Sequence, residues 1–204
     1  MQANEGVIKF DLAHRDAELA PWAEIGDLQH WFARCRALDL VGRHEHRYQG
    51  AAYGNISQRA PSGFLITGTQ TGGHESLDAS DICWVQHIDL DKNRLLSSGP
   101  SKPSSESMTH EQVYRNVPEA NFVIHVHHKP MWQQARRLGL EITAAEAEYG
   151  TPEMAREVER LLKQPHVRAR GAFSMGGHED GILVFGASAE QAGRRLEALF
   201  RQLA

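Results

Sequence analysis

Two histidines in one apolar run have a spacing that suits metal binding. His125 and His127 lie two residues apart in NFVIHVHH, so in a strand both imidazoles project from the same face. The apolar residues between and before them predict that this strand is buried, and a buried pair of imidazoles needs polar partners. Two neutral imidazoles on one face can bind a single divalent ion such as zinc. The alternative is a solvated pair on an exposed strand, which is common for an isolated H-x-H pattern.

A third ligand is needed, because a catalytic zinc usually takes three protein ligands and leaves one position open. His178 is the candidate, since the glycines of SMGGHEDG would let the backbone bring its ring close. Its other interpretation is an ordinary turn residue. His44 and His46 have the same H-x-H spacing but lie among Arg and Glu, so we interpret them as surface residues. His128 is expected to face away from His127 on the strand, and none of these three is a predicted ligand.

Glu106 stands at the start of a predicted helix over about residues 106–116, directly after SKPSS. A glutamate in the first turn is favoured by the helix dipole alone, or it acts as a general acid/base beside the metal. Ser104 and Ser105 have two interpretations as well. Either they cap the helix, or they hold an anion such as phosphate together with the helix amides, with Lys102 as a charge partner.

The elements that position these residues alternate between strand-like and helical patterns. Strands are predicted in GAAYGNISQRA, GFLITG, DICWVQHIDL, NFVIHVHH, GAFSM and GILVFG, with DKN as a hairpin turn. Helices are predicted from Asp27 to a stop at Gly42, over 106–116, from Pro130 to near Gly139, from Pro152 after a Thr151 cap, and after Ser188, whose capping box is completed by Gln191. The turns GNIS (54–57) and TGTQTGG (67–73) are either plain hairpins or anion-binding nests.

These patterns predict an α/β fold: a single domain with a mostly antiparallel central sheet flanked by helices. Residues 1–26 are expected to be an irregular lead-in, and residues 27–204 are expected to form the domain.

Composition excludes several classes of function. The 22 basic and 26 acidic side chains give a net charge of −4, so neither nucleic acid nor an anionic membrane is an expected partner. Only Cys35 and Cys83 are present, and no disulfide framework follows from two distant cysteines. The sequence has no signal-peptide pattern and no membrane-spanning apolar run. We therefore expect a soluble, cytoplasmic globular protein, and its 12 histidines favour a metal site.

The order of motifs resembles the class II aldolase/adducin family, which includes L-fuculose-phosphate aldolase and L-ribulose-phosphate 4-epimerase. The resemblance is carried by GNIS-x-R, LITGTQTG, KPSSE with a histidine four residues on, YRNVPEANFVIHVHH, YGTPEMA and the His178 turn, in this order. It covers about residues 27 to 201. The segment from KPSSE to HVHH is its most specific part.

The resemblance implies roles for individual residues. His125, His127 and His178 match the zinc ligands, with Mn²⁺, Fe²⁺ or Co²⁺ as other metals, and Glu106 matches the catalytic acid/base. The phosphate-binding positions match Asn55, Thr69 or Gly72, Ser104 and Ser105. The resemblance also implies a homotetramer with active sites between subunits. Three departures are visible: GGHEDG replaces the usual Asn-His-Gly around the third ligand, the Thr-Gly loop is lengthened, and the sequence ends at Ala204, before the extension that carries a catalytic tyrosine in aldolase members. Tyr149 is no clear replacement, because it belongs to the YGTPEMA motif.

We therefore expect a metal-dependent lyase of carbohydrate metabolism, of the class II aldolase type. It would cleave or form a carbon–carbon bond in a hydroxy-carbonyl substrate, most simply a sugar phosphate, through an enediolate that the metal stabilises. The first alternative is a zinc-dependent sugar-phosphate epimerase or dehydratase. The second is a non-catalytic interaction domain like the adducin head.

Overall fold

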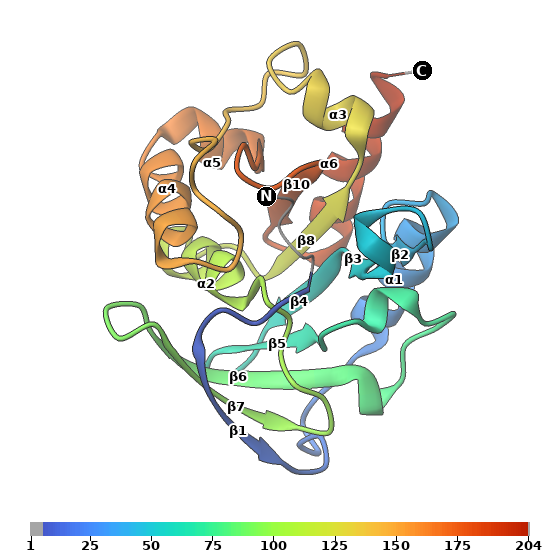
Figure 1. Cartoon of the computed structure of the whole chain (residues 1–204), viewed down its shortest axis with the longest axis vertical. Coiled ribbons are helices and arrows are strands. Elements are labelled where there is room, and N and C mark those ends of the chain that lie inside the picture. Colours follow the sequence, from blue (N-terminus) through green and yellow to red (C-terminus); the bar gives the residue numbers. More distant parts are fainter. Residues whose placement is uncertain (1–5, 204) are drawn as a thin grey trace.

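An eight-stranded sheet runs through the computed structural model, which describes residues 6–203 (Figure 1). The order across the sheet is β1-β7-β6-β5-β4-β8-β10-β9. Neighbouring strands are antiparallel except β1 and β7, which are parallel. The strands of this sheet are β1 (Asp11–Asp16), β4 (Asn55–Arg59), β5 (Phe64–Thr67), β6 (Ile82–Asp89), β7 (Arg94–Gly99), β8 (Phe122–His127), β9 (Ala172–Ser174) and β10 (Gly181–Gly186). The short strands β2 (Gly42–Arg43) and β3 (Ala52–Tyr53) pair separately.

Helices cover both faces of the sheet (Figure 1). They are α1 (Gly26–Ala37), α2 (Ser107–Asn116), α3 (Lys129–Gln133), α4 (Pro152–Leu162), α5 (Pro165–Arg170) and α6 (Ala189–Arg201). One apolar cluster joins α2, α4 and α5 to one face, and a second joins α1, α3 and α6 to the other. The expected α/β architecture with a mostly antiparallel central sheet is therefore confirmed. None of the helices within residues 6–203 combines the length and apolarity that crossing a bilayer requires.

The alternation of side chains on β8 decides which groups reach the site. Phe122, Ile124 and Val126 pack in the cluster with α1 and α6, whereas Val123 packs in the cluster with α2 and α4. His125 and His127 therefore project toward the α2 side, as the period of two predicts. β8 lies between β4 and β10 in the middle of the sheet, so both rings are enclosed on each side.

Several element boundaries differ from those expected. β1 lies within the segment that was expected to be irregular. Its polar sequence does not predict a strand, but parallel pairing with β7 supplies the backbone hydrogen bonds that make it one. α1 ends at Ala37, before Gly42, because Asp39 adopts a left-handed conformation with φ 55°. α3 ends at Gln133, and turns continue the chain to Gly139. The domain division at residue 27 stays a prediction.

The predicted caps are largely present. The Thr151 hydroxyl accepts a hydrogen bond from the Met154 N–H and so caps α4, with Pro152 as the first helical residue. Ser188 likewise accepts from the Gln191 N–H at the start of α6. The second half of the expected capping box is different, because the Gln191 side-chain oxygen accepts from the Ala187 N–H instead.

Candidate metal and active site

Three histidines from β8 and the turn before β10 form one buried cluster. His125 and His127 are fully buried and His178 is 3% exposed. One nitrogen from each of the three rings lies within 4.8 Å of the others, and the Nε2 atoms of His125 and His127 are 3.1 Å apart. Two zinc ligands at about 2.0–2.1 Å from a tetrahedral ion lie about 3.3 Å apart, so this separation fits a shared metal ion.

The surroundings of the rings also favour metal binding. The Nδ1 atom of His125 lies 3.3 Å from the Ile182 carbonyl oxygen, a contact that fixes this nitrogen as the N–H and leaves Nε2 as the ligand atom. Burial, with the neighbouring charges of His178 and His125, lowers the pKa of His127 well below its usual value. A neutral imidazole is the form that binds a metal. The three residues therefore fit the predicted metal site.

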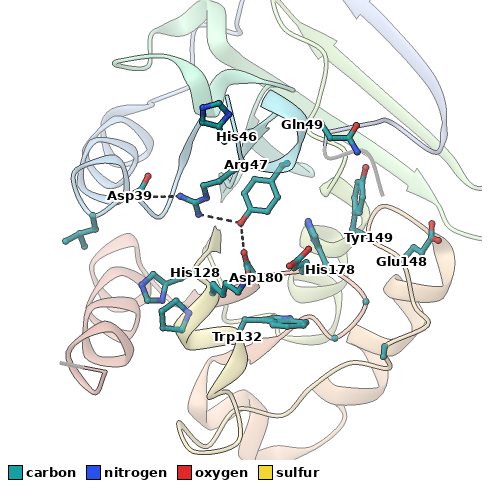
Figure 2. A pocket seen from close by; sticks show the side chains of 18 of the residues that line it. Asp39, His46, Arg47, Gln49, His128, Trp132, Glu148, Tyr149, His178 and Asp180 are labelled. Carbon is teal, nitrogen blue, oxygen red and sulfur yellow. Dashed lines mark hydrogen bonds and ion pairs between the residues drawn. The ribbon is translucent and has the colours of Figure 1, made fainter. Parts of the chain in front are cut away.

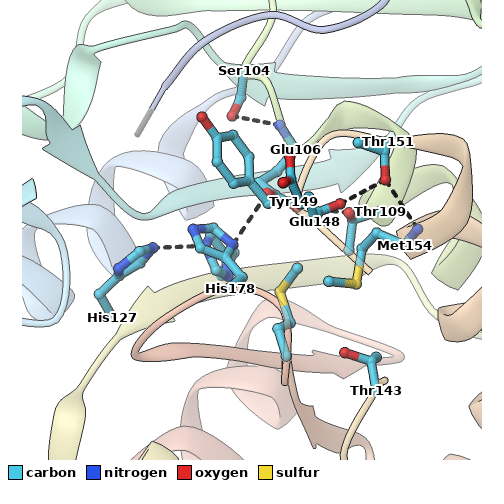
Figure 3. Close-up of polar contacts among 12 residues, drawn as sticks. Ser104, Glu106, Thr109, His127, Thr143, Glu148, Tyr149, Thr151, Met154 and His178 are labelled. Carbon is cyan, nitrogen blue, oxygen red and sulfur yellow. Dashed lines mark hydrogen bonds and ion pairs between the residues drawn. The ribbon is translucent and has the colours of Figure 1, made fainter. Parts of the chain in front are cut away.

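Glu106 is fully buried at the N-terminal end of α2, directly beside this cluster (Figure 3). Its Oε1 atom lies 3.2 Å from Nδ1 of His178, and its Oε2 atom accepts a hydrogen bond of 2.6 Å from the Thr109 hydroxyl. Burial raises the pKa of Glu106, but the hydrogen bond and charge of His178, the charge of His125 and the Thr109 bond lower it more, to about 2. The carboxylate is therefore ionised and is held in position by two neighbours.

Behind Glu106, one helical turn further along α2, lies a buried hydrogen-bonded chain of three side chains. Ser57 Oγ is 2.6 Å from Nδ1 of His110 and 2.7 Å from the Tyr114 hydroxyl. Burial and the charge of His125 lower the pKa of His110 to about 3, although Glu106 opposes this shift. A neutral His110 that accepts at Nδ1 from Ser57 ties α2 to β4. This chain fixes the helix that carries Glu106.

The residues predicted to bind phosphate lie at two places. Ser104, Ser105 and Asn55 are all at most 6% exposed. The Ser104 hydroxyl accepts a 3.3 Å hydrogen bond from the Glu106 N–H, so it serves the turn before α2. Asn55 is paired with His125 across β4 and β8. The two serines precede α2, Asn55 lies opposite His125, and the role of these three side chains in binding phosphate stays a prediction.

Thr69 and Gly72 belong to the Thr-Gly loop. The Thr69 N–H donates to the Lys102 carbonyl, which places Thr69 beside the segment that leads to the two serines. Gly72 packs instead on the β2–β3 pair: a Cβ atom there would lie 2.6 Å from the Tyr53 carbonyl oxygen. No contact in the described residues links Gly72 with the serines, and its predicted substrate role is likewise untested.

A cavity of about 1230 Å³ opens on the histidine cluster from the side of His178 (Figure 2). Its lining includes Tyr149, which stacks on His178 with ring centroids 4.7 Å apart, and Trp132, whose indole N–H donates to the Met175 carbonyl. His44 is predicted to be a surface residue and no metal ligand, and its ring contacts Asp39 at the surface. The cavity is large enough for a small phosphorylated substrate, which suits the expected class of partner.

Four side chains that line this cavity were not predicted from the sequence: Asp39, Arg47, Tyr48 and Asp180, which together form what we call its near wall. The Tyr48 hydroxyl donates a 2.8 Å hydrogen bond to Asp180, and the Tyr48 ring packs edge-on against His127 at a centroid distance of 4.8 Å. Arg47 donates to Asp39 at 2.8 Å. Arg47 and Tyr48 lie in RHEHRYQ, the segment whose histidines we interpret as surface residues. Its polar composition carries no signal of contact with a turn more than a hundred residues away.

Comparison with known proteins places this chain in a family. The model of the class II aldolase and adducin N-terminal domain matches residues 35–203. Curated relatives include methylthioribulose-1-phosphate dehydratases of Gluconacetobacter diazotrophicus, 35% identical over 107 residues, and of Sorangium cellulosum, 32% identical over 98 residues. The matches cover 52% and 48% of this chain, and 46% and 44% of those proteins, so the chain spans less than half the length of these relatives.

Solved structures share the fold at lower identity. An L-fuculose-1-phosphate aldolase from Thermus thermophilus is 21% identical, with a TM-score of 0.59 and coverage of 87% of both chains. A sugar-phosphate aldolase from Thermotoga maritima is 16% identical, with a TM-score of 0.62 and coverage of 87% of this chain and 90% of that one. These likenesses concern the fold, whereas the family model covers most of the sequence. The chain belongs to the class II aldolase and adducin N-terminal domain family.

Proposed function

We propose that the chain is a zinc-dependent lyase that removes water from a phosphorylated ketose. The observation that carries this proposal is the buried cluster of His125, His127 and His178 with the ionised Glu106 carboxylate 3.2 Å from His178. A buried triad of imidazoles beside a buried carboxylate is costly without a function. A non-catalytic interaction domain has no use for this arrangement, so the adducin-like alternative is disfavoured.

Dehydration is preferred over carbon–carbon cleavage because the curated relatives at 32–39% identity are named as dehydratases of methylthioribulose-1-phosphate. This was the alternative in the sequence prediction, whose first choice was an aldolase. The solved aldolases share the fold at 16–21% identity, too low to carry the reaction across. The proposed substrate is therefore a ketose phosphate with a hydroxyl on the second carbon from the carbonyl.

The chain's residues divide the chemistry between binding and proton transfer. A divalent ion bound by the three histidines would polarise the oxygens of the substrate as a Lewis acid. Glu106 takes the proton from the carbon next to the carbonyl, so that this C–H bond breaks. The C–O bond at the next carbon then breaks, and the hydroxide leaves with a proton as water. Ser104, Ser105 and Asn55 are proposed to hold the phosphate, with Thr69 beside them.

Two roles are open to Glu106, and both follow from its contacts. It acts on the substrate as the base, or it only orients the His178 ring as a carboxylate partner of a metal ligand. The variant Glu106→Gln keeps the shape of the side chain and separates them. As the base, its loss lowers turnover by ~10²–10⁴-fold with zinc still bound. As an orienting group, its loss lowers zinc affinity by about 10–100-fold, and saturating zinc restores turnover.

The experiment measures zinc content and turnover of the zinc-loaded protein on methylthioribulose-1-phosphate, ribulose-1-phosphate and fuculose-1-phosphate. Glu111→Gln is the matched control, because Glu111 lies on the same helix but lines a small cavity on the other side, next to Arg115. Products identify the reaction: a dicarbonyl compound and water indicate dehydration, two shorter carbonyl compounds indicate aldol cleavage, and a stereoisomer indicates epimerisation. Normal turnover of Glu106→Gln would refute the assignment of Glu106 as the base.

A further inference from the structure

The near wall of the cavity contains an unusual concentration of backbone conformations. Six non-glycine residues in the described part of the chain have positive φ, and four of them line this one cavity: Asp39, Tyr48, Gln49 and Asp180. Asp tolerates the left-handed region fairly well, but Tyr and Gln in succession, at φ 49° and 58°, do not. Strained backbone of this kind clusters at functional sites, where the surrounding structure holds a side chain in a required place.

The side chain held in this way is Tyr48. Its ring packs edge-on against His127, and its hydroxyl donates to Oδ2 of Asp180, two residues beyond His178. The phenol therefore lies against His127 and reaches the turn that carries His178, on the wall of the cavity. The dashed lines at Arg47 and Asp180 in Figure 2 mark the contacts that fix this hydroxyl.

A second tyrosine borders the same opening but directs its hydroxyl elsewhere. Tyr149 stacks on His178, and its hydroxyl accepts a 3.4 Å hydrogen bond from the Val7 N–H. Tyr48 differs, because its hydroxyl is held by the ends of two side chains, Asp180 at 2.8 Å and Arg47 at 3.5 Å. Rotation about its C–O bond is enough to redirect the proton from Asp180 to a ligand in the cavity.

From this geometry we infer that the Tyr48 hydroxyl is a catalytic hydrogen-bond donor to a substrate oxygen in the cavity, beside His178. The inference rests on the proposed function and adds a residue to it. Arg47 supports the role with positive charge next to the phenol oxygen, and it is itself anchored by Asp39. A donor aimed at an oxygen that gains negative charge during the reaction stabilises the transition state more than the bound substrate.

Tyr53 provides a matched control within the same network. Its ring lies 5.2 Å from that of Tyr48 and 5.6 Å from that of His127, and its hydroxyl also contacts Arg47. However, the Tyr53 hydroxyl donates to Asp39 at 2.6 Å, and the residue does not line the cavity. Tyr53→Phe thus removes a hydroxyl from the same cluster of side chains without removing a group that a substrate can reach.

The test compares Tyr48→Phe and Tyr53→Phe with wild type. Zinc per chain and the melting temperature are measured first, and both phenylalanine variants are expected to retain zinc, because each keeps the ring beside His127. For Tyr48→Phe we expect kcat to fall ~10²–10³-fold with KM changed less than about threefold, the pattern of a lost transition-state donor. Affinity for phosphoglycolohydroxamate, measured by calorimetry, is expected to fall about 3–10-fold. Tyr53→Phe is expected to match wild type in kcat, KM and probe affinity.

The outcomes distinguish a catalytic Tyr48 hydroxyl from a purely structural one. Wild-type kinetics and wild-type probe affinity for Tyr48→Phe would overturn the inference, and so would an equal loss in Tyr53→Phe, which would mean that the network matters only for structure. If zinc-loaded wild type turns over no ketose phosphate but binds the hydroxamate, the proposed function fails while probe affinity still tests Tyr48. If zinc-loaded wild type does not bind the hydroxamate either, the inference fails as well.

Discussion

The buried chain of Tyr114, Ser57 and His110 predicts a specific dependence of stability on pH. The pKa of His110 lies at about 3 in the folded protein, because burial and the charge of His125 disfavour its protonated form. In the unfolded chain a histidine titrates near its usual value of about 6.5. Between these two values the unfolded state binds a proton that the folded state does not. The contribution of neutral His110 is therefore fully present above about pH 6.5 and is lost as the pH falls toward about 3.

The size of this effect follows from linkage. Between about pH 7 and about pH 4.5 the two pKa values give a loss of about 2–3 kcal/mol in the free energy of unfolding, because a difference of one pKa unit corresponds to about 1.4 kcal/mol. The substitution His110→Gln removes the titrating group while leaving a side-chain oxygen that can accept from Ser57. At neutral pH the variant is expected to be less stable by about 1–3 kcal/mol, because the short 2.6 Å contact is replaced imperfectly.

The assay is urea unfolding at a series of pH values, in a chelator so that no metal contributes. The difference in the free energy of unfolding between wild type and His110→Gln should fall by about 2–3 kcal/mol between about pH 7 and about pH 4.5. His87→Gln is the control, because His87 is an exposed histidine on β6, and its curve should run parallel to that of wild type. Parallel curves for His110→Gln would refute the assignment of a neutral, buried His110.

Three further predictions concern the metal, the phosphate and a helix cap. His127→Ala is expected to abolish stoichiometric zinc binding, whereas His46→Ala leaves it intact; equal metal content in both variants, measured by atomic emission, would contradict the histidine cluster as the site. Replacing Ser104 and Ser105 together by alanine should weaken binding of phosphorylated ligands at least about tenfold if they hold phosphate; if they only shape the turn before α2, calorimetry will find affinity unchanged and urea unfolding will find lower stability. Thr151→Ala should cost about 0.5–2 kcal/mol in urea unfolding, since its hydroxyl caps α4, and a variant as stable as wild type would deny the cap any weight.

The parts of the structure that could be predicted from sequence are those with strong periodicity. The alternation in NFVIHVHH gave the burial and the facing of β8, and with it the shared face of His125 and His127. The helical spacing and caps of α4 and α6 are equally local signals. In each case the residues that decide the structure lie within a few positions of one another, so a short window of sequence contains the information.

The parts that could not be predicted depend on contacts between distant segments. β1 reads DLAHRD and lacks an apolar alternation; it exists as a strand because β7, about eighty residues later, offers a parallel partner at the sheet edge. α5 has six residues and only Val167 buried, too little for a periodic signal. Tyr48 was missed for the same reason, since its partner Asp180 lies 132 residues away and its left-handed backbone leaves no mark in the residue type.

The candidate site combines residues on the central sheet and its helices with residues on connecting segments. The histidine cluster and Glu106 lie on β8, at the start of α2 and in the turn before β10, in a fold that is shared with proteins only 16–21% identical. A shared fold does not by itself decide between dehydration and aldol cleavage. Under the proposed function, we expect that choice to come from groups around the rest of the substrate. In this chain Tyr48 lies in the turn after β2 and Asp180 lies after His178, whereas Trp132 lies on the short helix α3. Loops vary in length without disturbing the sheet that carries the metal site. Exchanging the segment that carries Tyr48 should therefore alter the ratio of reaction products while zinc remains bound.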